Sequence, residues 1–179
     1  DVHTANQKMA GLETRDQAKT FIYAFLYGAG ASKIGKVVGA GAREGQILID
    51  RFLQNLPALA RLRKMVTEAS EKGTVKALDG RLLHIRSSHA SLNTLLQGAG
   101  AIICKEWLVQ MDSLIRSSGI DVKLVASVHD EYQFEVAKKD VDVLGDITKK
   151  AMKQTEESLD VGCPLDCDHK VGNTWAETH

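Results

Sequence analysis

The chain has 179 residues, of which 44% are hydrophobic and 26% charged, as in an ordinary globular domain with a core of its own. No apolar run could span a bilayer, and the first residues lack the basic start and apolar stretch of a secretory signal, so we expect neither a membrane protein nor an exported one. Three cysteines without a repeated spacing argue against a disulfide framework and indicate a reducing compartment, the cytoplasm. The lack of an initiator Met suggests a piece of a longer or processed chain.

The formal net charge is zero, but the charges are distributed unevenly along the chain. From Lys33 to Arg86 there are 11 basic and 5 acidic residues, whereas from Asp121 to His179 there are 7 basic and 13 acidic residues. A basic segment suits a phosphate backbone and an acidic segment suits cations. Mixed charges also cover ordinary solvated helices, so the asymmetry alone does not decide between these interpretations.

The first half of the chain is predicted to be helical. Thr14 and Gln17 match a capping box, in which each side chain accepts a hydrogen bond from a backbone N–H at the start of a helix. That helix is expected to run to about Tyr27 and to end at Gly28 and Gly30, because glycine permits a left-handed backbone. Two more helices are expected, over residues 44–54 and 57–71.

After residue 73 the pattern changes to short strands and one long helix. Asp79-Gly80, between residues 74–78 and 81–86, is a strong signal for a hairpin turn. The predicted fold class is therefore α+β, mainly helical, with a small antiparallel sheet in the second half. The remaining expected elements are a helix over 89–117, strands over 122–128 and 132–136, a helix over 139–158 and a strand over 165–169.

A row of basic and aromatic residues marks the first long helix. Arg15, Lys19, Tyr23 and Tyr27 recur every four residues, so neighbours in the row are offset by only about 40° around the helix and the row is roughly 18 Å long. The two cations can pair with phosphates, and the aromatic rings offer flat faces to a sugar or base. An ordinary solvated helix with buried tyrosines is the alternative interpretation.

A second pattern lies between the two strands of the second half. The adjacent carboxylates of Asp130 and Glu131 repel each other, and oxygen ligands of this kind suit a divalent cation such as Mg²⁺. Phosphoryl transfer uses such ions between the attacking and leaving oxygens. A polar hairpin tip without a metal is the alternative interpretation.

A third pattern lies on the long helix, where His89, Asn93 and Gln97 again recur every four residues. Polar side chains among leucines need hydrogen-bond partners or water. The minor groove presents an acceptor at every base pair, so amide donors can touch a duplex there without reading its sequence. An ordinary polar helix face explains the spacing equally well.

Together these patterns resemble the DNA polymerases of family A, the DNA polymerase I type. The row from Arg15 to Tyr27, followed by Gly28, has the spacing of that family's motif B helix. Residues 128–131 resemble its motif C, and residues 93–98 resemble its palm helix that contacts template and primer. The resemblance covers the chain from His3 to the tail and is nearest to the replicative polymerases of short-tailed phages, which implies the cytoplasm of a bacterial host.

The resemblance implies how an incoming deoxynucleotide (dNTP) would bind. Arg15 and Lys19 would hold its triphosphate, and Lys19 would also act in catalysis. His3 would contact the same triphosphate. Tyr23 would lie against the ribose, and Tyr27 would help to place the templating base.

The resemblance also implies a metal site and a DNA-binding surface. Asp130 and Glu131 would act in catalysis, Asp130 as a metal ligand and Glu131 as a weaker ligand or as an outer residue beside the metal, and the complete enzyme would use two Mg²⁺ ions. His129 would contact the primer end. The other residues expected to contact the DNA primer-template are His89, Asn93 and Gln97.

The resemblance further implies a fingers subdomain over residues 1–73, with the motif B helix at about 14–28, and a palm over 74–179, with motif C at about 128–131. Motif A, the thumb and a 3′–5′ exonuclease are not recognised. We therefore expect a DNA-directed DNA polymerase fragment that is inactive alone and needs an upstream segment or partner chain supplying motif A and the thumb. The palm sheet would then have an open edge, which favours self-association.

Three alternatives belong to other functional classes. A non-catalytic nucleic-acid-binding remnant of such a polymerase would bind DNA without Mg²⁺-dependent dNTP binding. A self-contained hydrolase built on Asp130 and Glu131 would need further metal ligands, and the sequence offers no convincing cluster of them. A purely structural domain would leave the basic and aromatic row unexplained.

Overall fold

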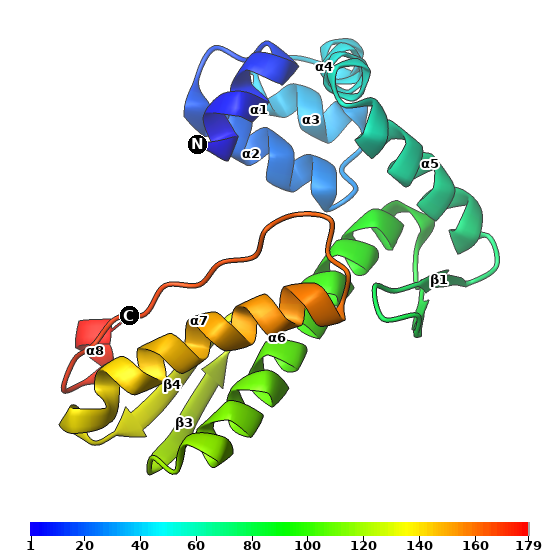
Figure 1. Ribbon diagram of the computed structural model, residues 1–179. Coiled ribbons are helices and arrows are strands. Elements are labelled where there is room, and N and C mark those ends of the chain that lie inside the picture. Colours follow the sequence, from blue (N-terminus) through cyan, green and yellow to red (C-terminus); the bar gives the residue numbers. More distant parts are fainter. Residues whose placement is uncertain (179) are drawn as a thin grey trace. The chain divides into compact units, whose positions relative to one another are not determined.

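The computed structural model describes residues 1–178, and the chain forms two compact units. The first unit is Asp1–Gly98, and the second begins at Ala99, within a long helix. None of the helices in residues 1–178 combines the length and the apolar character needed to cross a membrane. Mainly helical structure with two small antiparallel hairpins confirms the predicted α+β class (Figure 1).

The first unit contains the helix that carries the basic and aromatic row, α2 (Arg15–Leu26). The predicted capping box is confirmed, because Thr14 Oγ1 accepts from the Gln17 amide N–H and Gln17 Oε1 accepts from the Thr14 amide N–H. Gly28 follows the helix with a left-handed φ of 79°. The other elements of this unit are α1 (Val2–Ala10), α3 (Ala31–Val37), α4 (Ala42–Asn55), α5 (Pro57–Ser70), β1 (Thr74–Lys76), β2 (Leu82–His84), the 3-10 turn η1 (Ser88–Ala90) and the start of α6 (Ser91–Ser118).

Helices α4 and α5 and the β1–β2 hairpin confirm the elements predicted there, within a few residues at each end. Sequence reasoning did not predict α1 and α3. Helix α3 is seven residues long and lies between glycines, so the sequence there gives little indication of a helix. Helix α1 depends on the Asp1 side chain, which caps its first turn by accepting from the His3 amide N–H.

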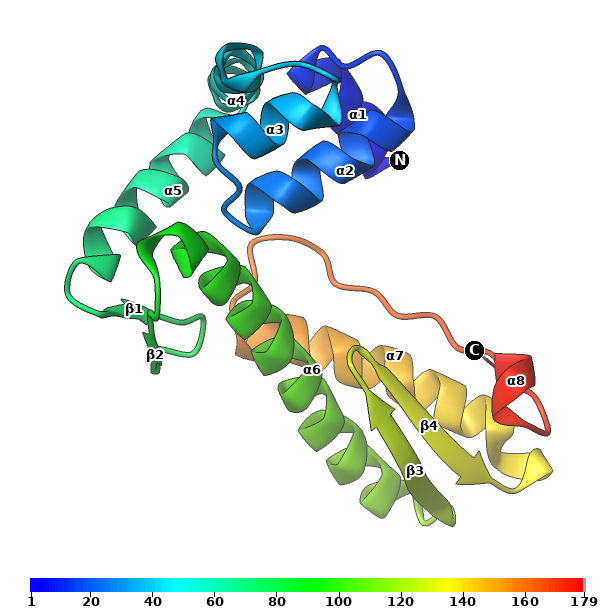
Figure 2. The same cartoon turned by 180° about the vertical axis from the view of Figure 1, so that it is seen from behind.

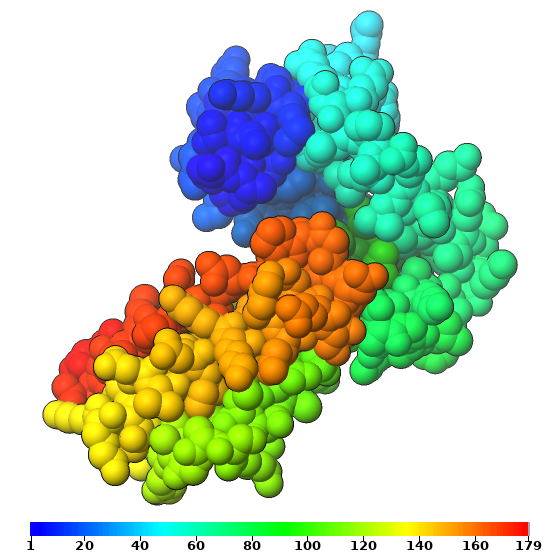
Figure 3. All heavy atoms as spheres, viewed as in Figure 1, coloured from blue at the N-terminus to red at the C-terminus, as the bar shows by residue number. Residues whose placement is uncertain are grey.

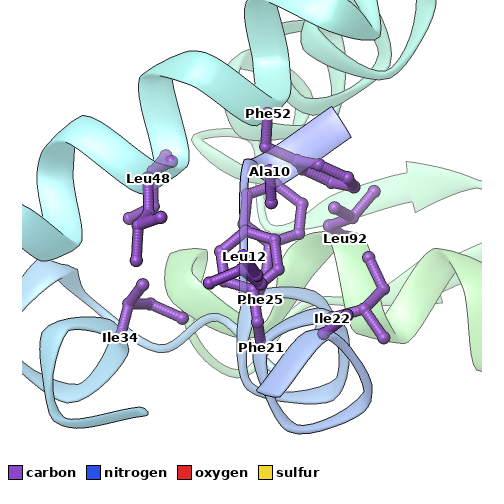
Figure 4. Close-up of a cluster of buried hydrophobic side chains, with 11 residues drawn as sticks. Ala10, Leu12, Phe21, Ile22, Phe25, Ile34, Leu48, Phe52 and Leu92 are labelled. Atoms are coloured by element: carbon purple, nitrogen blue, oxygen red, sulfur yellow. The ribbon is translucent and has the colours of Figure 1, made fainter. Parts of the chain in front are cut away.

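Three phenylalanines form the centre of the first unit's core (Figure 4). Phe21 and Phe52 meet edge to face with ring centroids 5.1 Å apart, and Phe25 meets Phe52 edge to face at 5.5 Å. Edge-to-face pairs add about 0.5–1.5 kcal/mol beyond the burial of their surface. The buried side of α2 therefore holds it against α4, so its opposite side is turned to solvent.

The second unit is a hairpin covered by two helices. Strands β3 (Val122–Val128) and β4 (Glu131–Val136) pair antiparallel with a bulge between Leu124 and Ala126. Both helices lie on the same side of this hairpin, which is in front of them in Figure 2. They are the second half of α6 and α7 (Val141–Ser158), and the remaining elements are the 3-10 turn η2 (Lys138–Asp140) and α8 (Trp175–Thr178).

The core of this unit joins all three elements. Trp107 and Met111 of α6 pack with Met152 of α7, and Tyr132 and Phe134 of β4 pack against them. The Trp107 indole N–H donates to the carbonyl oxygen of Thr148, 3.0 Å away. The hairpin is thus held to the helices by one face of β4, as the alternation of strand side chains requires.

Two details of the prediction are wrong. Residues 165–169 do not form a strand; the Leu165 amide N–H donates instead to the Glu156 side chain at 2.7 Å, and Leu165 and Cys167 pack onto the core as an irregular strap. A strand needs a ladder partner, and this segment has none among the described residues. The long helix begins at Ser91, so His89 lies on the preceding 3-10 turn η1.

The first compact unit extends beyond the expected end of the fingers at residue 73, because the β1–β2 hairpin packs beside α5. The division between fingers and palm is a functional one and stays a prediction.

After the strap, the C-terminal residues, red in Figure 3, lie beside the yellow residues at the start of α7.

Candidate functional site

Helix α2 presents the basic and aromatic row to solvent. Arg15 and Lys19 are exposed, Tyr23 is 50% exposed and Tyr27 is 62% exposed. Large aromatic side chains are usually more buried than this, so their exposure calls for an explanation. The opposite face is buried, as expected from the sequence, through Ala18, Ile22 and Phe25.

Lys19, Tyr23 and Tyr27 of the row line an open groove on the surface of the first unit, and Arg15 lies outside it. The groove has a volume of about 630 Å³. Its lining combines two ammonium groups, one carboxylate and two phenol rings, which is a mixture suited to a ligand with both anionic and flat parts. The lining residues are Asp16, Lys19, Thr20, Tyr23, Ala24, Tyr27 and Lys33.

Asp1 holds the first cation of the row. Arg15 Nε donates to Asp1 Oδ2 at 2.6 Å, and the same carboxylate accepts from the His3 amide N–H and the Thr4 hydroxyl. The same Asp1 carboxylate therefore both caps α1 and binds Arg15. Sequence reasoning missed this residue, although an Asp followed by helix-forming residues is a typical N-cap signal.

Helix α1 brings His3 to the same row. The His3 and Tyr23 ring centroids lie 6.3 Å apart with an interplanar angle of 49°. His3 Nδ1 is buried and has no hydrogen-bond partner within the described structure. Buried polar atoms are normally paired, so this nitrogen has a hydrogen-bonding capacity that a water or a bound group can satisfy.

The second candidate site is the turn between β3 and β4. Val128 pairs with Glu131, so His129 and Asp130 form a two-residue turn, and His129 has a left-handed φ of 54°. Residues other than glycine rarely adopt this conformation, although His is among those enriched in it. The turn leaves Asp130 exposed, while Glu131 begins β4 and is half-buried.

The hairpin next to this turn is anchored on α6. The Tyr132 hydroxyl donates to the Cys104 carbonyl oxygen at 2.8 Å, and the Tyr132 ring lies 5.3 Å from that of Trp107. Burial, and secondarily the nearby Asp130 carboxylate, raises the pKa of the Cys104 thiol. Burial also raises the pKa of the Tyr132 hydroxyl. Asp130 thus lies close to α6.

The donor set of this turn fits a divalent cation only in part. Asp130 and Glu131 supply the carboxylate oxygens that Mg²⁺ prefers. Within residues 1–178, however, no three His, Cys, Asp or Glu side chains come together as a metal-binding group. A complete coordination shell would need oxygens from a bound substrate, from water or from another segment.

The polar residues of the third sequence pattern, which we expect to contact DNA, lie on two different elements. Asn93 and Gln97 lie one turn apart on α6, half-buried and exposed respectively, and His89 is exposed on η1. The backbone of His89 meets the end of α2, because a Cβ added to Gly28 would lie 1.9 Å from the His89 carbonyl oxygen. His89, the first residue of this set, therefore lies next to Gly28, which directly follows the row on α2.

Comparisons with known proteins point to one family. The chain matches the family model of DNA polymerase family A over residues 1–177. It is 41% identical to the DNA-directed DNA polymerase of Enterobacteria phage T3, 40% to that of Escherichia phage T7 and 42% to that of Escherichia phage Phieco32, each over the whole of this chain. It spans 29–30% of the length of these relatives.

A solved structure shares the fold. The POL domain of Pol1 from M. smegmatis, in complex with DNA primer-template and dNTP, superposes with a TM-score of 0.78 at 21% sequence identity. The match covers 87% of this chain and 31% of the mycobacterial chain. It supports the fold independently of the sequence comparisons.

Proposed function

Since this chain belongs to DNA polymerase family A, we propose that it forms the dNTP-binding fingers and part of the palm of a DNA-directed DNA polymerase. The observation that carries the proposal is the row on α2, which lies exposed along a groove instead of packing into the core. The chain spans only 29–30% of its phage relatives, so the whole activity would belong to a longer polypeptide or an assembly.

The groove would hold the incoming dNTP. Lys19 would act as a point charge on the triphosphate, and Arg15 would add a planar fork of donors. Asp1 occupies the Arg15 Nε, which leaves the two terminal nitrogens for phosphate oxygens. The buried His3 nitrogen would meet the same group, and the exposed Tyr23 ring would lie against the ribose.

In the reaction, the 3′-oxygen of the primer attacks the α-phosphorus of the dNTP, the bond from that phosphorus to the bridging oxygen breaks, and pyrophosphate leaves. Lys19 and Arg15 would stabilise the negative charge that develops on the leaving group. Asp130 and Glu131 would hold Mg²⁺, which when bound lowers the barrier by neutralising charge on the attacking and leaving oxygens. A further carboxylate from motif A would complete that site.

The DNA would contact the residues that follow the row. His129, held in its left-handed turn beside Asp130, would approach the primer end. Asn93 and Gln97 would donate to minor-groove acceptors without reading the sequence. The mycobacterial neighbour was captured with DNA primer-template and dNTP, which supports these assignments through the shared fold.

The test is primer extension with Mg²⁺ and all four dNTPs. The chain would be assayed alone, mixed with a separately expressed upstream segment, and within the full polymerase, each with an Asp130→Asn counterpart. We expect synthesis only with the upstream segment present, and at least about 10²-fold less synthesis by the Asp130→Asn variant, because an amide replaces the charged carboxylate. DNA binding without synthesis under every condition would favour the non-catalytic binding module instead.

A further inference from the structure

Strand β4 presents two sets of side chains. Tyr132 and Phe134 pack into the core of the second unit. Because side chains alternate along a strand, Glu131 and Gln133 project together from the other face. This face carries one of the two carboxylates assigned to the metal site and a neighbouring amide.

The two polar side chains are hydrogen-bonded to each other. Gln133 Nε2 donates to Glu131 Oε1. An amide donor on one carboxylate oxygen restricts rotation of the group and directs the second oxygen elsewhere. Outer partners of this kind orient metal ligands, and their removal typically costs about 10–100-fold in metal affinity or activity.

The Gln133 amide is itself held from the C-terminal end of the chain. The Thr178 hydroxyl in α8 lies 3.1 Å from Gln133 Oε1 and can donate to it. The same hydroxyl lies 3.1 Å from the Trp175 carbonyl oxygen, an alternative acceptor within the helix. The bend before α8 is fixed separately, because the Asn173 amide N–H donates to Glu177 Oε2 at 2.7 Å.

We propose that Gln133 is a positioning residue for the Glu131 carboxylate and that Thr178 fixes the orientation of the Gln133 amide. The physical reason is the asymmetry of an amide group. If it turned over, its oxygen would face the carboxylate and repel it. The ionised Glu131 carboxylate only accepts hydrogen bonds, so it selects the orientation in which the NH₂ group faces it, and the hydroxyl that donates to the amide oxygen holds the group there. The C-terminal helix, 45 residues further along the chain, thereby acts on the metal site. The inference rests on the proposed function.

The experiment uses the full polymerase that contains this chain. The variants are Gln133→Leu, which removes the amide, Thr178→Val, which removes the hydroxyl at nearly constant shape, and Thr178→Ser, which restores it. Thr67→Val is the matched control, because Thr67 is exposed on α5 and, among the described residues, its hydroxyl donates only to the Arg63 carbonyl oxygen within that helix. Steady-state kinetics would give kcat, the KM for dNTP and the half-saturating Mg²⁺ concentration. Electron paramagnetic resonance would measure Mn²⁺ binding to the polymerase–DNA complex directly.

For Gln133→Leu we expect about tenfold weaker Mn²⁺ binding and a comparable rise in half-saturating Mg²⁺, with a lower kcat and an unchanged KM for dNTP. Thr178→Val should change the same quantities in the same direction but less, because it acts through Gln133. Thr178→Ser and Thr67→Val should match the parent enzyme. Loss of folding would instead lower the active fraction without changing the metal dependence of the remainder.

Parent-like metal binding in both Gln133→Leu and Thr178→Val would overturn the inference. If Thr178→Val alone matched the parent, the part assigned to the C-terminal helix would be wrong. Asp130→Asn separates these outcomes from the proposed function. If that variant keeps full activity, the metal site itself is misassigned, whereas if it is inactive while both other variants are normal, only the positioning role fails.

Discussion

The Asp1 carboxylate lies 2.6 Å from the Arg15 Nε, so the first cation of the row on α2 is already paired with an anion from the protein. Both side chains are about half exposed, and exposed pairs of this kind contribute little to stability. The pair matters for function, because the negative charge of Asp1 competes electrostatically with a phosphate that binds the two terminal nitrogens of the same guanidinium.

Asp1→Asn tests this competition. Asn caps a helix about as well as Asp, so α1 should be preserved while the negative charge is lost. We expect tighter dNTP binding by up to about fivefold at low salt, and a smaller gain at high salt, because exposed charges are screened. The measurement is the dNTP dissociation constant of the polymerase–DNA complex in single-turnover experiments. Weaker binding would mean that Asp1 orients Arg15 more than it competes with phosphate.

Gly28→Ala should destabilise the first unit by about 1–3 kcal/mol. Gly28 has a left-handed φ, which is strained for alanine. An added Cβ would also lie 1.9 Å from the His89 carbonyl oxygen, which is a steric clash. The midpoint of urea unfolding measures the loss. Gly100→Ala is the matched control. Gly100 lies within α6 with nothing near its Cβ position, so alanine there should stabilise by about 0.5–1 kcal/mol. Equal effects of the two changes would contradict the assigned close contact.

Phe52→Ala should be among the costliest single substitutions in the first unit. Phe52 is fully buried and lies edge to face against both Phe21 and Phe25. Removing the ring leaves a cavity between α2 and α4, at an expected cost of about 3–5 kcal/mol. Met65→Ala is the comparison, since Met65 is 65% exposed and should change stability by less than about 0.5 kcal/mol. Chemical denaturation of both variants checks the difference.

Tyr132→Phe should alter stability at high pH. Burial raises the folded-state pKa of the Tyr132 hydroxyl, so its protonated form is favoured in the fold. The resulting stability is fully present below the unfolded pKa and is lost as pH rises through the folded pKa. At neutral pH the variant should lose about 0.5–1.5 kcal/mol with the bond to the Cys104 carbonyl oxygen.

The same variant should lose less stability than the parent as the solution becomes alkaline. Thermal unfolding followed from neutral pH to above the normal pKa of tyrosine measures this slope. Tyr27→Phe, which changes an exposed hydroxyl, should keep the parent slope. If Tyr132→Phe keeps it too, the hydroxyl is not the titrating group.

The features that sequence alone determined are local ones. The four-residue spacing from Arg15 to Tyr27 and the capping box at Thr14 place the row on one helix face, because both depend only on helical geometry. The turn at His129 and Asp130 follows in the same way from two flanking β-type runs. These local patterns also carried the resemblance to the family.

Tertiary structure decided which distant residues meet. The Asp1–Arg15 pair, the approach of His3 to Tyr23 and the bond between Thr178 and Gln133 join residues from different elements, and no periodicity encodes such contacts. The expected strand at residues 165–169 failed for the same reason, since a strand exists only when another backbone pairs with it. Hydrogen bonds within a helix can be predicted from neighbouring residues, whereas those between elements are decided by how the core packs.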